Sequence, residues 1–188
     1  MMFSSEKRYT YADLLAWDDT IRVELIKGVP VPMETPPVIH QSVIMDLGRQ
    51  LCNHLLGKQP MALYGIGVCP LASTRALPED INTLVIPDFV ILFDRTGQND
   101  SEYRGAPPLV MEVLSPSTDR QDRVVKYSLY QQAGVQEYWI VDPVKQMVLV
   151  HTLNDGRYGS PIAYTKEEPV PVGVLEGCEI DLTTVFPE

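Results

Sequence analysis

Two strongly apolar segments, each interrupted by one carboxylate, constrain the fold of this chain more than any other feature. Residues 84–93 read LVIPDFVILF around Asp88, and residues 109–115 read LVMEVLS around Glu112. Strands that are apolar on both faces are typical of the centre of a sheet covered by helices on both sides. A carboxylate buried there without a partner is strongly unfavourable or takes up a proton, so each of these two needs a partner.

The residues after the second apolar segment predict a parallel pair of strands. A polar stretch over 119–133, ended by Gly134, indicates a helix. The apolar stretches 137–143 and 147–153 that follow indicate a hairpin. A strand, a helix and a second strand between residues 109 and 141 imply a right-handed parallel crossover inside a mixed sheet.

The first third of the chain predicts two helices and a hairpin. Thr10 and Asp13 have the spacing of a capping box at the start of a short helix. Residues 21–33 alternate around a glycine as in a hairpin, and the prolines of 35–37 favour the start of a helix that ends at Gly57. The expected apolar stripe of that helix consists of Val38, Ile39, Val43, Leu47, Leu51 and Leu55.

The chain shows no repeat, linker or domain boundary. Residues 61–73 indicate one strand weakened by glycines, whereas 74–83 and 94–108 are typical of loops. We therefore expect a single α/β domain over residues 1–188, with a mixed central sheet flanked by helices.

Composition narrows the classes of function. With 15 Lys and Arg against 25 Asp and Glu, the net charge of −10 argues against tight non-specific binding of nucleic acid, although a local basic groove remains compatible with it. The three cysteines form no C-x-x-C pair, which disfavours a disulfide framework or a structural zinc site. No apolar run is long enough to span a bilayer and no secretory signal is present, so we expect a cytoplasmic protein without a membrane partner.

The two buried carboxylates have two readings. Each could form a salt bridge with an arginine, for which Arg22, Arg75 and Arg104 are available. Alternatively, both could converge on one divalent cation, because Mg²⁺ is held by one or two carboxylates together with waters and phosphate oxygens.

Two further charged residues bear on this choice. Glu24 is either a third carboxylate of the site or a solvent-facing strand residue opposite Arg22 or Lys27. Lys126 either reaches the acidic strand ends from the helix after Glu112 or lies on the wet face of that helix.

The remaining polar and aromatic candidates favour a structural role. We expect local packing or a hydrogen bond for His40, at the start of its helix. For Tyr138 and Trp139 we expect core positions rather than a platform for stacking bases.

An ordered series of motifs runs through the chain. It comprises ELIKG at 24–28, PP-x-x-H at 36–40, PD at 87–88, EVLSPST at 112–118, D-x-x-x-K-x-x-x-Y at 122–130 and GVQEYWIVDP at 134–143. This series resembles the Uma-two family of restriction-endonuclease-like proteins, a branch of the PD-(D/E)XK nuclease superfamily. The resemblance extends from about residue 9 to 182.

The resemblance implies a restriction-endonuclease-like αβββαβ core. It also implies Asp88 and Glu112 as metal ligands and Glu24 as an additional acidic residue, which would bind the metal through water or support a second ion. The superfamily places its lysine two residues after the second acid, where this chain has Leu114, so the lysine role passes to Lys126 on the next helix.

The function expected from these residues is a Mg²⁺- or Mn²⁺-dependent endonuclease that hydrolyses DNA, with Glu24, Asp88, Glu112 and Lys126 as catalytic residues. Two alternatives stay open: a catalytically silent domain of the same fold that binds or regulates, and a hydrolase of small phosphate esters. Nucleases that cut two strands commonly pair, so a homodimer through the apolar hairpin at 137–153 is a further hypothesis.

Overall fold

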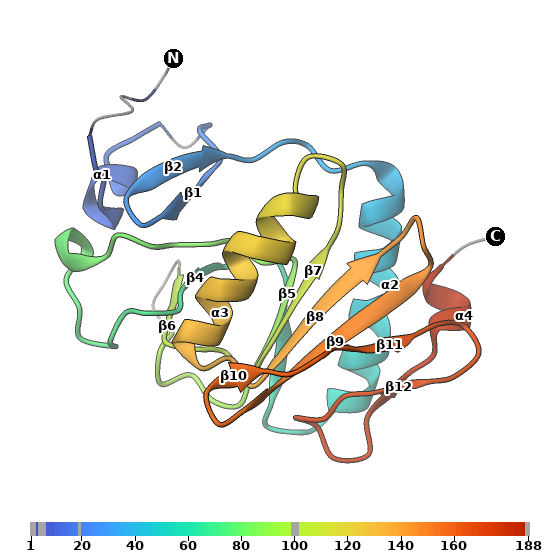
Figure 1. Cartoon of the computed structure of the whole chain (residues 1–188). Coiled ribbons are helices and arrows are strands. Elements are labelled where there is room, and N and C mark those ends of the chain that lie inside the picture. The colour runs from blue at the N-terminus through green and yellow to red at the C-terminus, as the bar shows by residue number, and fades with distance from the viewer. Residues whose placement is uncertain (1–2, 4–6, 19, 99–101, 187–188) are drawn as a thin grey trace.

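The computed structural model describes residues 3, 7–18, 20–98 and 102–186, which form a seven-stranded mixed sheet with a helix on each face (Figure 1). The predicted α/β class and mixed central sheet are confirmed. Within the described residues, no helix is both long and apolar enough to cross a membrane.

The central sheet has the order β10-β9-β8-β7-β5-β3, with β11 also paired to β9. Its two central strands, β7 (Leu109–Val113) and β8 (Glu137–Asp142), run parallel, as the crossover between them predicts. The other pairs are antiparallel, and they add β5 (Phe89–Leu92) and β3 (Met61–Leu63) on one side. The other side is completed by β9 (Met147–Asn154), β10 (Arg157–Tyr158) and β11 (Ile162–Tyr164).

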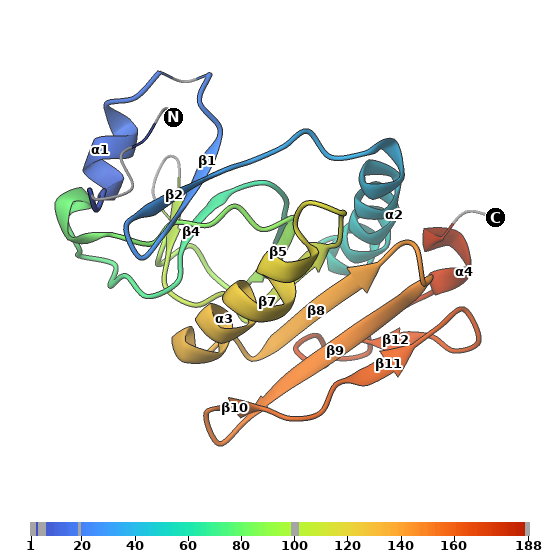
Figure 2. The ribbon, with the colours of Figure 1, turned by 45° about the horizontal axis from the view of Figure 1, so that its top comes forward.

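Opposite faces of the sheet carry different helices because side chains alternate along each strand. The long helix α2 (Val38–Leu55) packs Val43, Leu47 and Leu51 against one face. The helical segment before β8, which ends as α3 (Tyr127–Ala133), covers the other face, as Figure 2 shows. Gly134 ends α3 in the left-handed region, at φ +89°, as predicted from its position.

The N-terminal part forms a separate layer at one end of the sheet. The short helix α1 (Tyr11–Leu15) begins with the predicted capping box, and β1 (Val23–Ile26) and β2 (Val29–Pro32) form the predicted hairpin. Beneath them, β4 (Gly67–Cys69) pairs in parallel with β6 (Glu102–Arg104).

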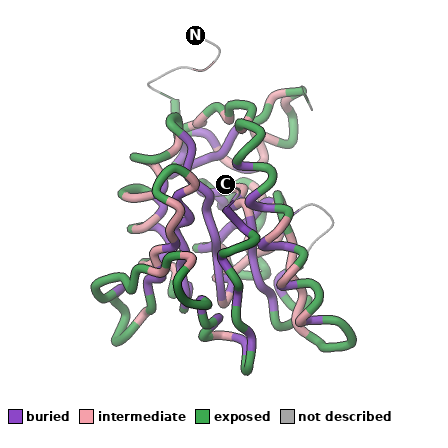
Figure 3. The backbone as a smooth tube through the Cα atoms, turned by 90° about the vertical axis from the view of Figure 1, so that its right-hand side faces the viewer, coloured by how far each residue is buried: buried purple, intermediate pink, exposed green. Residues whose placement is uncertain are grey.

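The C-terminal residues close the face that α2 covers. This part contains β12 (Val170–Pro171), β13 (Glu179–Ile180) and the short helix α4 (Leu182–Val185), and its apolar side chains join those of α2. Figure 3 shows that the buried backbone is concentrated in the strands at the centre of the molecule.

Several boundaries differ from the sequence predictions. Residues 61–73 form two strands in different sheets, and β6 lies in the stretch expected to be a loop. Glycine at 65 has φ +62° and turns the chain between β3 and β4, which explains why one strand becomes two. Within 84–93 only 89–92 form a strand, so Asp88 lies just before β5 rather than inside it.

The exposed surfaces bring one further correction. Val38 and Ile39, expected in the apolar stripe of α2, are 87 % and 40 % exposed. Every residue of β8 is buried within the single chain, so the exposed side chains of the hairpin lie on β9, and the homodimer through this hairpin stays a prediction. Tyr138 and Trp139 are core residues, as predicted.

Candidate active site

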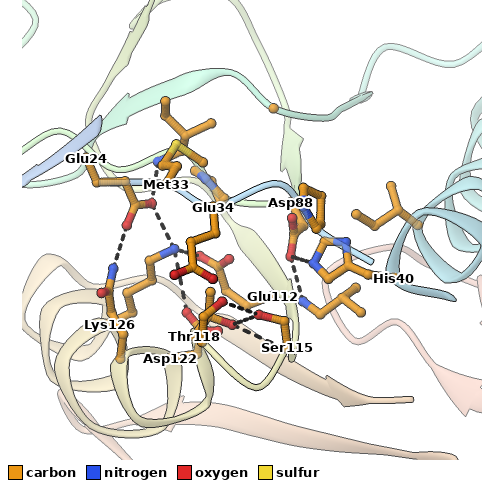
Figure 4. Close-up of a pocket in the computed structure, with 18 of the residues that line it drawn as sticks. Glu24, Met33, Glu34, His40, Asp88, Glu112, Ser115, Thr118, Asp122 and Lys126 are labelled. Atoms are coloured by element: carbon orange, nitrogen blue, oxygen red, sulfur yellow. Dashed lines mark hydrogen bonds and ion pairs between the residues drawn. The ribbon is translucent and has the colours of Figure 1, made fainter. Parts of the chain in front are cut away.

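Lys126 lies at the centre of an acidic cluster. Its ammonium Nζ is 2.8 Å from Oε1 of Glu24, 2.9 Å from Oε1 of Glu112 and 3.6 Å from Oδ1 of Asp122. All four side chains are at least 95 % buried, and Figure 4 shows them converging on one point. The structure therefore brings together Glu24, Glu112 and Lys126, three of the four residues predicted from the sequence.

Asp88, the fourth, lines the same cavity on its opposite side (Figure 4). Its Oδ2 accepts a hydrogen bond from the backbone N–H of Val113, at 2.7 Å, and lies 3.2 Å from Nε2 of His40. The bond to Val113 ties the end of β5 to the end of β7. Asp88 is thus fixed beside Glu112 although it makes no direct contact with Lys126.

The helix before β8 begins at Asp119 but widens into a π-helix over Gln121–Lys126. A π-helix has i→i+5 hydrogen bonds, so residues five apart in sequence lie close to one face of it. In an α-helix the residues that share a face are three or four apart. Gln121 and Lys126 are five apart and both bind Glu24, with Nε2 of Gln121 2.6 Å from Oε2. The widened turn therefore directs an amide and an ammonium to the same carboxylate.

Glu24 is held from three directions. In addition to Gln121 and Lys126, the backbone N–H of Ile86 donates to its Oε1 at 2.8 Å. Both oxygens of Glu24 are therefore engaged. The bond to Ile86 also attaches β1 of the N-terminal layer to the segment that leads into β5.

Glu112 and Asp88 each have one oxygen engaged. Oε1 of Glu112 accepts from Lys126 and from the hydroxyl of Tyr130, the latter at 2.7 Å. Among the described residues, no hydrogen bond or ion pair reaches Oε2 of Glu112 or Oδ1 of Asp88. Each acid therefore keeps one oxygen for a ligand in the cavity.

The electrostatics of the cluster are dominated by burial and by an excess of carboxyl groups. Desolvation, reinforced by Asp122, Asp88 and Glu24, raises the pKa of Glu112 well above its ordinary value despite the opposing attraction of Lys126. Burial likewise raises the pKa of Asp122 to about 6, again against Lys126. For Lys126, burial disfavours the charge, but Glu112, Glu24 and Asp122 outweigh it and raise the lysine pKa well above its ordinary value.

The donor chemistry of the cluster fits a hard divalent cation. Five carboxyl groups, those of Glu24, Glu34, Asp88, Glu112 and Asp122, line the cavity against the two cations Lys126 and Arg22, and Asp122 Oδ1 is buried without a hydrogen bond. In the described part of the chain, no group of three or more His, Cys, Asp or Glu side chains is spaced as a metal cage. Mg²⁺ does not require one, because it keeps several waters and needs only one or two carboxylates.

The salt bridges to arginine that were considered for these acids do not form among the described residues. Within the described residues, no arginine forms an ion pair with Asp88, Glu112 or Glu24. The expectation of a wet-face position for Lys126 is wrong, because its side chain is 5 % exposed.

Three residues that contact the site, Asp122, Tyr130 and Gln121, were not among the site residues predicted from the sequence. Asp122 and Tyr130 belong to the D-x-x-x-K-x-x-x-Y motif, so their spacing from Lys126 was the available signal. Gln121 had no such signal, because its position depends on the π-helix. His40 forms a polar contact, as expected from the sequence. Because its partner is Asp88, His40 lies at the site.

A cavity of about 230 Å³ opens over these groups. The hairpin, the N-terminal end of α2 and the ends of β5 and β7 form its walls. Asp88 and Glu112 both line it, the first with a partly exposed side chain and the second with a buried one.

Fold and site together define a protein of the nuclease-like α/β class. A solved structure described as a putative nuclease belonging to DUF820 from Anabaena variabilis ATCC 29413 superposes with a TM-score of 0.74, covering 94 % of this chain and 97 % of that chain. Sequence identity is 16 %, so this likeness shows the fold.

The family follows from sequence matches over most of the chain. Residues 11–183 match the family model Uma2, described as "Putative restriction endonuclease". The "Uncharacterized protein slr1290" of Synechocystis sp. (strain ATCC 27184 / PCC 6803 / Kazusa) is 30 % identical over 150 residues, 77 % of this chain and 74 % of that protein. The chain belongs to the Uma2 family, the one that its motifs resemble.

Proposed function

We propose that this protein is a Mg²⁺- or Mn²⁺-dependent endonuclease that hydrolyses phosphodiester bonds of DNA in the acidic cavity. The observation that carries the proposal is the excess of carboxyl groups at the site, where three of them converge on the Lys126 ammonium and Asp88 lines the opposite wall of the same cavity. A bound cation of charge two would offset that imbalance. The fold and the family support the reaction class.

Asp88 and Glu112 would hold the metal through Oδ1 and Oε2, the oxygens that have no protein partner. The metal would supply a bound water of lowered pKa and neutralise charge on a phosphate oxygen. Asp122 would add negative charge close to the ligands. Glu24, expected from the sequence to be a further metal ligand, has both oxygens engaged, and we assign it instead to positioning Lys126.

Lys126 would act as a cation. Its carboxyl neighbours raise its pKa well above the ordinary value, which favours the ammonium form. As an ammonium it can orient the water and stabilise negative charge that develops on the phosphate. The fixed geometry from Glu24 and Glu112 preorganises it for this role.

A cleavage assay tests this proposal. Supercoiled plasmid, a linear duplex and a single-stranded oligonucleotide are incubated with the protein in Mg²⁺ or Mn²⁺ at low salt. We expect metal-dependent cleavage that is lost in Asp88→Asn and Glu112→Gln. Absence of cleavage of every substrate would contradict the proposal and favour a silent binding domain, whereas cleavage that persists in both variants would contradict the assigned site.

A further inference from the structure

An exposed aromatic ring and an arginine line the cavity outside the acidic cluster. Tyr64 is 67 % exposed although it belongs to the cavity wall. Arg22 lines the same cavity from the N-terminal hairpin and is exposed. Neither has a role in the chemistry proposed for the carboxylates and Lys126.

Strand register places Tyr64 beside the metal-binding end of β5. Leu63 pairs with Val90, and the next contact is a hydrogen bond from the N–H of Gly65 to the carbonyl of Pro87, at 3.3 Å. Tyr64 lies between these two contacts, one strand away from Asp88. Tyr64 and Asp88 also line the same cavity, so a group bound at Asp88 shares that cavity with the tyrosine side chain.

Arg22 approaches the cavity from the other side. It precedes Glu24 by two residues, and its carbonyl accepts from the N–H of Met33, which extends the hairpin to this point. Residues two apart on an extended chain point to the same face, so Arg22 lies on the face of Glu24, about 7 Å along the strand. In the described part of the chain no ion pair neutralises Arg22.

We infer that Tyr64 and Arg22 form a subsite for an unpaired nucleotide next to the scissile phosphate, so that the substrate is a single-stranded or locally unpaired segment of nucleic acid. The inference deepens the proposed nuclease function and rests on it. Tyr64 stacks on one face of a base, and Arg22 binds the phosphate that follows. In a duplex both faces of each base are covered by neighbouring base pairs, so only an unpaired base can stack on the ring.

The charge of the chain supports an unpaired substrate. Duplex binding depends on neutralising several phosphates with lysine and arginine, and this chain carries a net charge of −10. Stacking on an aromatic side chain contributes about 5- to 150-fold in affinity per base without an additional positive charge. A single ring and a single arginine can therefore hold one strand where a duplex would be repelled.

The wall of the cavity next to Tyr64 offers apolar surface. Pro32, the last residue of β2, and Met33, which follows it, line the same cavity and provide apolar surface for a base.

The experiment measures binding separately from cleavage. Glu112→Gln, in which cleavage is expected to be blocked, serves as the background. Fluorescence anisotropy in Mn²⁺ compares a labelled 15-nucleotide single strand with the same strand annealed to its complement. Tyr64→Ala, Tyr64→Phe and Phe93→Ala are added to this background, with Phe93 as a 41 % exposed aromatic that does not line the cavity.

We expect the single strand to bind at least tenfold more tightly than the duplex. Tyr64→Ala should weaken single-strand binding about 10- to 100-fold, whereas Tyr64→Phe retains the ring and Phe93→Ala leaves the wall intact, so both should change it less than threefold. Arg22→Gln should reduce the dependence of binding on salt. Equal binding of both forms, or equal losses in Tyr64→Ala and Phe93→Ala, would overturn the inference.

Cleavage by the protein with native Glu112 separates this inference from the function on which it rests. Metal-dependent cleavage of duplex at the same rate with and without Tyr64→Ala would remove the subsite and leave the nuclease standing. Hydrolysis of the p-nitrophenyl ester of thymidine 5′-monophosphate, with no cleavage or binding of either oligonucleotide, would contradict both and favour a small-ester hydrolase.

Discussion

Two buried carboxylate sites in this protein are built on opposite principles. In the N-terminal layer, Glu102 pairs with Arg104, whose Nε and Nη2 lie 3.0 and 2.8 Å from Oε1, and Tyr11 donates to Oε2 at 2.9 Å. The negative charge of Glu102 is thus balanced by the positive charge of Arg104. At the cavity, Lys126 alone faces Glu24, Glu112 and Asp122, with Asp88 nearby.

The difference separates a structural ion pair from a candidate active site. Arg104 also donates to the carbonyl of Ala76, so the Glu102 site closes the packing of the N-terminal layer. The salt bridge to arginine that was considered for Asp88 and Glu112 is thus formed by a different acid, Glu102. Excess negative charge beside a cavity is unfavourable for folding alone, and the proposed function accounts for it with a bound cation.

The largest expected difference between the two sites is in activity. Asp88→Asn and Glu112→Gln keep the side-chain shape but remove a charge from the metal ligands, so cleavage should fall roughly 10²–10³-fold or more. Glu102→Gln changes an acid of similar burial and should retain activity within about threefold at a temperature where it is folded. Initial rates of plasmid cleavage in Mn²⁺ measure both effects, and similar losses in all three variants would contradict the distinction.

Substituting the acid should change the free energy of unfolding by different amounts at the two sites, and even in opposite directions. Glu102→Gln leaves the Arg104 guanidinium without its counter-charge and should lower the free energy of unfolding by about 3–5 kcal/mol. Glu112→Gln relieves repulsion and keeps an oxygen for Lys126 and Tyr130, so the metal-free protein should change by less than about 1 kcal/mol or become more stable. Urea unfolding in EDTA provides the measurement, and a larger loss in Glu112→Gln would refute the charge imbalance.

The pH dependence of stability should carry the signature of Asp122. Burial raises its pKa from 3.8 to about 6 in the folded state, so between those values the folded protein binds more protons than the unfolded chain. The contribution of Asp122 is therefore fully present below about pH 4 and is lost as pH rises through 6, by about 2–3 kcal/mol. Asp122→Asn should remove that loss. Unfolding free energies of both proteins at pH 4, 5 and 6.5 in EDTA check it, and parallel curves would contradict the assignment.

Two tyrosines give the smallest and most closely matched comparison. Tyr130→Phe removes one hydrogen bond from Oε1 of Glu112, and Tyr11→Phe removes one from Oε2 of Glu102. Each should cost about 1 kcal/mol of stability. Because Tyr130 orients a proposed metal ligand, Tyr130→Phe alone should also weaken Mn²⁺ binding, by about tenfold. Calorimetric titration tests this split, and equal Mn²⁺ affinity in the two variants would show that Tyr130 is purely structural.

Local patterns predicted most of the fold. The crossover between β7 and β8, the first hairpin, α2 and the capping box at Thr10 all follow from periodicity and from turn or cap residues close together in the chain. The predictions failed where distant partners decide the structure. β6 is a strand because β4 lies beside it, and the exposure of Val38 depends on how α2 packs against the rest of the molecule.

The site was predictable as a set of residue types but not as an arrangement. Glu24, Glu112 and Lys126 meet as expected, since carboxylates in apolar strands stand out in the sequence. The π-helix that turns Gln121 toward Glu24 has no signature in the composition of residues 121–126, and it alone makes the approach possible. The contact of His40 with Asp88 depends on the packing of α2, which sequence spacing does not specify.

Direct measurement of Mn²⁺ binding by isothermal titration calorimetry tests the central claim that a divalent cation balances the acids of the cavity. We expect saturable binding to the native sequence, at least tenfold weaker binding in Asp88→Asn and Glu112→Gln, and unchanged binding in Glu102→Gln. If the native sequence takes up no Mn²⁺, or if the two cavity variants bind it as tightly, then Lys126 and retained protons are sufficient partners for these carboxyl groups and no cation belongs to the site.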